Sequence, residues 1–217
     1  ALNISSGFTV NGPLNLNATG NSSIAGNLAL ASSSTNTWSV NPNLTMTVSG
    51  NISGTSAAIT KNGTGLLVLS GSNSYTGATT INAGTLQIGA GGTTGSLSAS
   101  SAITNNATLL IDRSDSLTLG NTISGTGVLT KNGTGTLTLS AVNSYTGGTT
   151  VNAGTLTLAA AAANGTIRGN LTINQGARVD ANATNWSLGY GGTQNYLGNS
   201  VSAITINGGT LNFTNTS

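Results

Sequence analysis

Cysteine, histidine and glutamate are absent from this sequence of 217 residues. Without cysteine, the chain can form neither a disulfide framework nor a thiolate metal site. Histidine and glutamate are common general acids and bases near neutral pH, so acid–base catalysis would have to rest on the three aspartates. These absences predict a protein that is not an enzyme and that holds no cofactor and no metal.

Charge and long apolar runs are also scarce. Lysine and arginine together number five, charged residues make up 4% of the chain, and the formal net charge is +2. So small an excess, with no cluster of basic residues, does not predict binding to nucleic acid. No run of about 18 apolar residues occurs, so we expect no membrane insertion by this segment.

The chain is instead rich in glycine, threonine, asparagine and serine, and 36% of its residues are hydrophobic. Disordered chains are usually poor in apolar residues and rich in charge, and this chain is neither. Its polar residues suit turns and strand surfaces, whereas exposed helices normally carry glutamate and lysine. The composition therefore favours a β-rich, exported surface protein over a cytosolic enzyme.

One long segment occurs twice. Residues 131–158, KNGTGTLTLSAVNSYTGGTTVNAGTLTL, align without a gap on residues 61–88, KNGTGLLVLSGSNSYTGATTINAGTLQI, with 20 of 28 positions identical. With the residues that precede them, the internal repeats span 52–88 and 123–158. Both ends of the chain also read as repeat-like sequence, so we interpret residues 1–217 as a single solenoid segment of a longer protein.

A shorter motif, threonine followed by valine or isoleucine and then asparagine, recurs along the whole chain. Its spacings of 71, 70, 22 and 33 residues indicate a unit of about 20–24 residues that an inserted loop sometimes lengthens. Asparagine tolerates left-handed backbone and can bond to a neighbouring turn, so we expect a structural corner ladder of asparagines. Its members would be Asn11, Asn82, Asn152, Asn174 and Asn207.

Within each unit the apolar residues alternate with a period of two, as in TLTL, and glycine-rich turns such as NGTG separate the short runs. Short strands that repeat every 20–24 residues are best accommodated by a coil in which equivalent strands of successive turns stack in parallel. The sequence therefore predicts an all-β fold, a parallel β-helix (β-solenoid) of about ten rungs.

The long repeat resembles a known family. Gly-Thr-Gly-x-Leu-x-Leu, Asn-x-Tyr-x-Gly-x-Thr and Asn-x-Gly-x-Leu follow one another in both copies, as in the autotransporter-associated β-strand repeat, also called the passenger-associated transport repeat. The resemblance implies a right-handed parallel β-helix from the passenger of a bacterial surface protein. It also implies an extracellular location at the bacterial cell surface.

Candidate catalytic residues are few. Asp112 and Asp115 flank Arg113 in IDRSDS, and we interpret this segment as a charged turn. Paired carboxylates also serve polysaccharide-degrading enzymes, some of which are β-helices, so that class stays a remote alternative. The glycine-rich NGTG turns lack the lysine and hydroxyl residues that end a phosphate-binding loop.

Aromatic residues suggest one binding site. Tyr75 and Tyr145 occupy equivalent repeat positions, which favours packing at a corner. The irregular loop 182–200 holds Trp186, Tyr190 and Tyr196, which could stack on sugar rings or contact a partner, or could instead pack back on the rod.

The sequence thus predicts an extracellular structural rod or stalk that serves adhesion or assembles into filaments. Its expected partners are further copies of itself, end to end or side by side, or flanking repeats of the same chain. Glycans or a host surface are a further expectation, and a glycan-binding adhesin module using the 182–200 loop is the alternative function.

Overall fold

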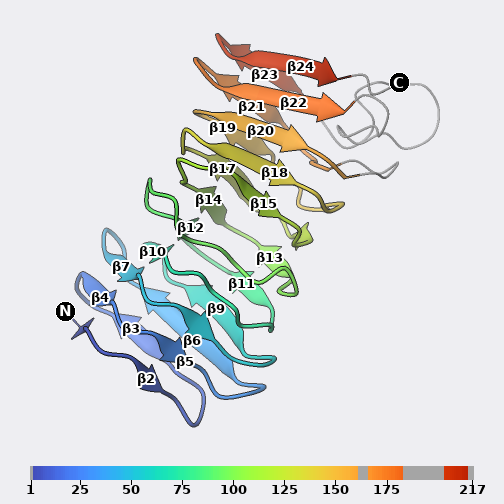
Figure 1. Ribbon diagram of the computed structural model, residues 1–217. Helices are drawn as coiled ribbons and strands as arrows, with labels where there is room; N and C mark the ends of the chain where they lie inside the picture. The colour runs from blue at the N-terminus through green and yellow to red at the C-terminus, as the bar shows by residue number, and fades with distance from the viewer. Residues whose placement is uncertain (1, 161–165, 183–202, 215–217) are drawn as a thin grey trace.

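The computed structural model describes residues 2–160, 166–182 and 203–214, and within these ranges the chain is a stack of short strands without a helix (Figure 1). All pairs formed between two of these strands are parallel, from β1 with β4 to β22 with β24. The prediction of an all-β parallel β-solenoid is confirmed. No helix long and apolar enough to cross a membrane occurs in the described ranges.

The described strands lie on three faces, which the chain passes in the order first, second, third, although some turns have no strand on the second or third face. The first face is one ten-stranded sheet: β1 (Asn3–Ile4), β4 (Ser22–Ile24), β7 (Thr45–Val48), β10 (Leu66–Leu69), β12 (Thr85–Ile88), β14 (Thr108–Ile111), β17 (Val128–Lys131), β19 (Thr149–Val151), β21 (Leu171–Asn174) and β23 (Ile204–Asn207).

The second face carries two sheets. Near the N-terminus these strands are β2 (Phe8–Thr9), β5 (Leu28–Ala29) and β8 (Ile52–Ser53). Further along the chain they are β15 (Leu117–Leu119), β18 (Thr136–Leu139), β20 (Thr155–Leu158), β22 (Arg178–Asn182) and β24 (Thr210–Thr214).

The third face is a six-stranded sheet. Its strands are β3 (Leu16–Ala18), β6 (Thr35–Val40), β9 (Ala58–Asn62), β11 (Thr79–Ile81), β13 (Ile103–Asn105) and β16 (Ile123–Ser124).

Turn length varies while the register is kept. Along the first face a step is as short as 19 residues, from Val68 to Gln87, and as long as 24, from Ser23 to Thr47. The last step, from Thr172 to Thr205, is 33 residues long and passes through residues that the structure does not describe. From β1 to β21 the described stack makes eight turns, so the expected ten rungs were slightly too many.

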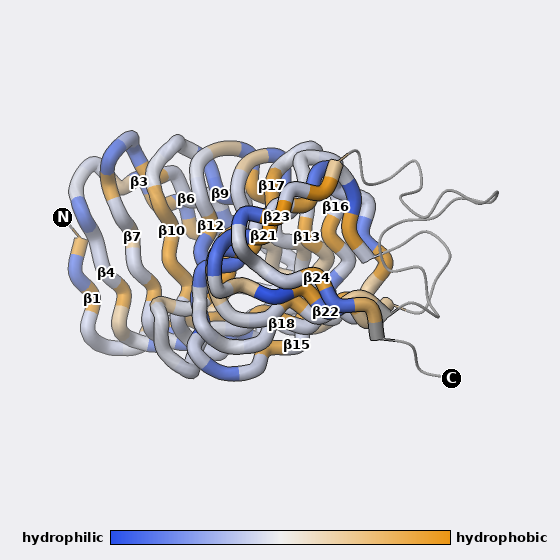
Figure 2. The backbone as a smooth tube through the Cα atoms, turned by 90° about the horizontal axis from the view of Figure 1, so that it is seen from above, coloured by the Kyte–Doolittle hydropathy of each residue, from blue (hydrophilic) through white to orange (hydrophobic). Residues whose placement is uncertain are grey.

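The core is a set of inward columns. On the first face Ile24, Val48, Leu69 and Ile88 lie directly above one another, and all four are fully buried. Alternate residues of the same strands, such as Thr47 and Gln87, point outward and are partly exposed. Hydrophobic residues accordingly recur along the stacked strands when the coil is seen from above (Figure 2).

The two copies of the long repeat do not lie on the same faces. In the first copy β9 and β11 belong to the third face, and β10 and β12 to the first. In the second copy β17 and β19 belong to the first face, and β18 and β20 to the second. The seventy residues between the copies therefore span three turns plus one face, and the second copy is rotated about the solenoid axis by one face.

Candidate functional site

The asparagine that opens the NSYTG segment ties three turns together. Asn73 Oδ1 accepts the Ile52 N–H of the preceding turn at 3.0 Å. Its Nδ2 donates to the Gly71 carbonyl of its own turn at 3.1 Å and to the Ser96 carbonyl of the following turn at 2.9 Å. Asn143 repeats this pattern in the second copy, with Ile123 N, Ala141 O and Thr166 O. Both asparagines are buried.

The tyrosine two residues later fills the core of the same corner. The hydroxyls of Tyr75 and Thr79 lie 2.7 Å apart, and those of Tyr145 and Thr149 lie 2.6 Å apart. All four side chains are buried. Burial raises the pKa of both tyrosine hydroxyls well above their usual value. The threonine of Asn-x-Tyr-x-Gly-x-Thr thus supplies the partner that a buried phenol needs.

The glycine of the same motif is required by close contact between turns. A Cβ atom at Gly77 would overlap the Ala57 carbonyl, and one at Gly147 would overlap the backbone of Gly127. Only a residue without a side chain lets the two turns approach this closely.

Two buried lysines were missed by the sequence analysis. Lys61 lies in an inward column between Trp38 and Ile81, and Lys131 lies between Ile111 and Val151. Their exposed fractions are 0% and 2%. The short motif already contained the signal for these buried lysines. Both lie in Thr-Lys-Asn, at the position where the other copies of the short motif have valine or isoleucine.

The lysine ammonium groups are held by backbone carbonyls at a corner. Lys61 Nζ donates to the carbonyls of Asn62 at 2.8 Å, Gly63 at 2.7 Å and Ala83 at 3.1 Å. Lys131 Nζ donates to Gly133 O at 2.5 Å and to Ala153 O at 2.9 Å. Each ammonium therefore joins its own turn to the next one. Burial lowers the pKa of each lysine to about 8.

Three of the five predicted corner asparagines come together. Asn207 donates to Asn174 at 3.1 Å, Asn174 to Asn152 at 2.6 Å, and Asn152 to Asn132 at 2.7 Å. This exposed amide ladder follows the first face. Asn82 lies beside the third face and donates to Asn62 at 3.0 Å, and Asn11 follows β2 on the second face. The five residues therefore do not form one column.

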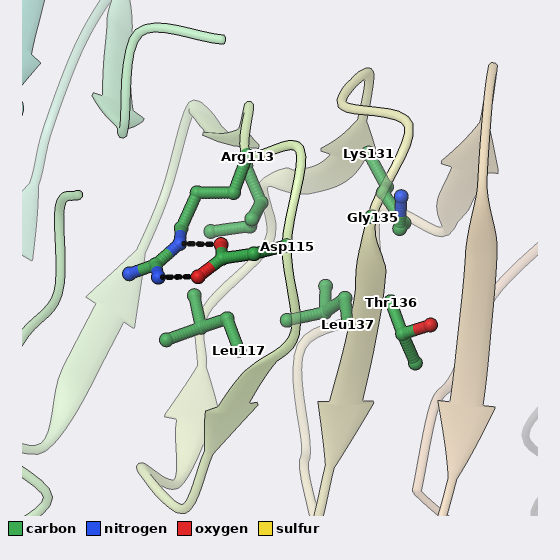
Figure 3. Close-up of a pocket in the computed structure, with 8 residues that line it drawn as sticks. Arg113, Asp115, Leu117, Lys131, Gly135, Thr136 and Leu137 are labelled. Atoms are coloured by element: carbon green, nitrogen blue, oxygen red, sulfur yellow. Dashed lines mark hydrogen bonds and ion pairs between the residues drawn. The ribbon is translucent and has the colours of Figure 1, made fainter. Parts of the chain in front are cut away.

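Arg113, in the charged segment after β14, binds both a neighbouring loop and Asp115, and its ion pair with Asp115 is drawn in Figure 3. Arg113 binds Asp115 through two hydrogen bonds of 2.8 and 2.7 Å, and donates to the carbonyls of Gly95 and Thr93 at 2.6 and 2.7 Å. The Arg113 guanidinium lowers the pKa of the Asp115 carboxyl. Asp112 accepts a hydrogen bond from Gln87 Nε2 at 3.4 Å. Arg113 and Asp115 thus form an ion pair, and Arg113 also binds the loop that contains Thr93 and Gly95.

The hollow next to this pair is small. It lies between Arg113 and Lys131, above Leu117 and Leu137, and its empty volume is about 150 Å³ (Figure 3). That volume includes space open to the solvent, and the hollow encloses no room for a small ligand. Within the described ranges, no three acidic, histidine or cysteine side chains come together as metal ligands would. Trp186, Tyr190 and Tyr196 lie outside the described residues.

Comparison with known proteins identifies the family of the repeats. The profile of the passenger-associated transport repeat matches residues 59–88 and 129–158. The adhesin BmaC autotransporter of Brucella suis biovar 1 (strain 1330) is 49% identical over 107 residues, which is 48% of this chain and 3% of that protein. The matched part is therefore a small fraction of the relative's length. No solved structure matches the chain.

The matched segments contain the residues described above. Each one runs from the strand with the buried lysine, through the asparagine–tyrosine–threonine corner, to the strand after the second asparagine corner. The residues that define the family motif are thus the ones that form the corners of a turn and its contacts with the neighbouring turns. The chain carries two passenger-associated transport repeats, folded as turns of a parallel β-solenoid.

Proposed function

We propose that this chain is a rigid β-solenoid rod in the passenger of a bacterial surface adhesin, where it supports adhesion at the cell surface. The observation that carries the proposal is the 49% identity to an autotransporter adhesin, over a region that includes passenger repeats. The named relative is an adhesin, and adhesion is inferred for this chain from that likeness.

The geometry is compatible with a supporting role. The side chains that the motif specifies make contacts inside the coil: the buried asparagines and lysines bond to backbone groups of neighbouring turns, and the buried tyrosines bond to threonine hydroxyls of their own turn. Such cross-ties resist bending, and a solenoid built of them presents long outward faces.

Adhesion is testable with the purified chain. Beads coated with it should bind host cells or extracellular matrix more than beads coated with a thermally denatured sample. Rotary-shadowed electron micrographs of the same preparation should show rods. If rods are present but the coated beads bind no better than the denatured controls, the adhesive role is contradicted and the rod structure is not.

The glycan-binding alternative is favoured by the aromatic composition of residues 182–200. On a glycan array, Trp186→Ala should weaken any binding that the unmodified chain shows. The matched control is Tyr190→Phe, which keeps an aromatic ring for stacking. An array without any signal would exclude this role for the ligands tested.

A further inference from the structure

Two asparagine–glycine pairs lie in identical stretches of sequence. Residues 60–65 and 130–135 both read TKNGTG. In such a pair the glycine nitrogen can attack the asparagine side-chain amide, because glycine has no Cβ atom to hinder it. Identical neighbours give the two pairs the same reactivity in an unfolded chain. Any difference between them in the folded protein therefore comes from the structure.

The peptide group between Asn62 and Gly63 has a buried cation on its oxygen. Lys61 Nζ donates to Asn62 O at 2.8 Å, and this carbonyl belongs to the same peptide group as Gly63 N. An ammonium group beside a peptide favours its deprotonated form, in which the nitrogen is a nucleophile. In the second copy Lys131 Nζ donates to two other carbonyls and not to that of Asn132. The first pair therefore has an activating contact that the second lacks.

The Gly63 N–H is also free to lose its proton. It has no hydrogen-bond partner among the described residues, and Gly63 is partly exposed. Gly133 is buried, and its N–H bonds to Ile111 O at 3.5 Å. Water or hydroxide therefore reaches the nitrogen of the first pair more easily than that of the second.

The side-chain amide of Asn62 is polarised by the next turn. Asn82 Nδ2 donates to Asn62 Oδ1 at 3.0 Å. A donor at this oxygen stabilises the negative charge that develops there when Cγ is attacked. Asn152 supplies the equivalent donor to Asn132 at 2.7 Å, so this contact is common to both copies.

We propose that Asn62 and Gly63 form a self-modification site, at which the folded chain converts Asn62 to aspartate or isoaspartate. The Gly63 nitrogen bonds to Asn62 Cγ and the Cγ–Nδ2 bond breaks. Nδ2 leaves as ammonia with the proton that Gly63 N gives up, and a cyclic succinimide remains. Water then opens the ring at one of its two carbonyl carbons, adding OH to that carbon and H to the ring nitrogen. The reaction needs only water, and it is independent of whether the chain adheres to cells.

The second copy is the internal control for the test. The purified chain is kept at pH 7 for several weeks, and peptide mapping by mass spectrometry gives the fraction of acid at residues 62 and 132. In the folded chain Asn62 should react roughly tenfold faster than Asn132, which is the factor that one charge-assisted hydrogen bond supplies. In concentrated urea the two rates should be equal. Equal rates in the folded chain, or a faster reaction at Asn132, would overturn the proposal.

Three variants test the assigned contacts. Lys61→Met removes the cation and should reduce the rate at Asn62 to that at Asn132, whereas Lys131→Met should leave the rate at Asn132 unchanged. Each lysine precedes the reacting asparagine, so every rate is divided by the rate of the same variant in urea. Asn82→Ala changes an exposed side chain, so it should keep the β-sheet spectrum and slow the reaction at Asn62 alone. An unchanged rate at Asn62 in either folded variant, Lys61→Met or Asn82→Ala, would contradict the role given to that contact and overturn the proposal.

Discussion

At the scale of single residues, this fold depends on polar side chains inside a narrow core. Asn73, Tyr75 and Lys61 are all buried, and each binds groups from neighbouring turns or from its own corner. Buried polar groups are tolerated only when their hydrogen bonds are made. The repeat motif keeps those partners together, because they recur at fixed positions in every copy.

Removing a buried asparagine should therefore destabilise the protein. Asn73→Ala leaves Ile52 N–H and two carbonyls without their partner, and we expect a loss of about 2–4 kcal/mol in the free energy of unfolding. The control Asn152→Ala removes an exposed ladder amide and should change it by less than about 1 kcal/mol. Urea unfolding followed by circular dichroism measures both. Equal effects of the two substitutions would show that burial of the amide does not matter.

The buried lysines make stability depend on pH. An unfolded lysine keeps its proton up to about pH 10.5, whereas the folded Lys61 and Lys131 have a pKa of about 8. Between these values the unfolded chain binds more protons, so the free energy of unfolding should rise from pH 8 to pH 10. Above pH 10 the unfolded tyrosines ionise while Tyr75 and Tyr145 stay neutral, so stability should fall again.

Urea titrations at half-unit steps from pH 7 to 11 measure this profile. The rise between pH 8 and pH 10 should be smaller in Lys131→Met, which keeps only Lys61. A stability that stays constant from pH 8 to pH 10 would mean that the carbonyls hold both ammonium groups charged in the folded chain.

At the scale of the turn, close approach of backbone decides which glycines are required. Gly147 packs on Gly127 of the preceding turn, whereas Gly92 has open space where a Cβ would be. Glycines of these two kinds look alike in the sequence. The first kind fixes the distance between turns, and the second kind only links strands.

Alanine substitutions should separate the two kinds. Gly147→Ala forces two turns apart and should lower the melting temperature strongly, or prevent folding. Gly92→Ala should leave the melting temperature nearly unchanged, because its Cβ meets nothing within 4 Å. Differential scanning calorimetry of both variants tests this, and a tolerated Gly147→Ala would mean that the turns separate easily.

At the scale of the whole molecule, the repeat unit folds in the same way on different faces of the solenoid. The same 28-residue segment occupies the third and first faces in one copy and the first and second faces in the other. Each corner is specified by its own residues and by contact with the next turn. The direction in which a repeat points is therefore set by the accumulated length of the turns before it.

Because the repeat folds in the same way on different faces, we expect the chain to fold after a deletion that joins equivalent positions of the two copies. Removing residues 61–130 joins Thr60 to Lys131 and recreates Thr-Lys-Asn at the corner, with every later strand rotated by one face. The shortened chain should keep its β-sheet spectrum, and small-angle scattering should show a rod shorter by about 16 Å.

The matched control keeps one residue more. Removing residues 61–129 inserts Thr130 before Lys131, which turns the lysine outward relative to Ile59, and should destabilise the chain because one-residue slips exchange the two sides of a strand. Aggregation of the seamless deletion would show that the faces are not interchangeable.

The sequence by itself determined the unit, its period and the inward or outward direction of most side chains. These follow from local chemistry: alternation has a period of two, and glycine and asparagine mark the turns. Tertiary structure alone decided which face each repeat occupies, which asparagines meet, and where the buried ammonium groups bind. Those outcomes depend on turn lengths of 19–24 residues added over several turns, and on carbonyls some twenty residues away in the chain. A local sequence pattern does not determine the added length of several turns or a contact with a residue so far away in the chain.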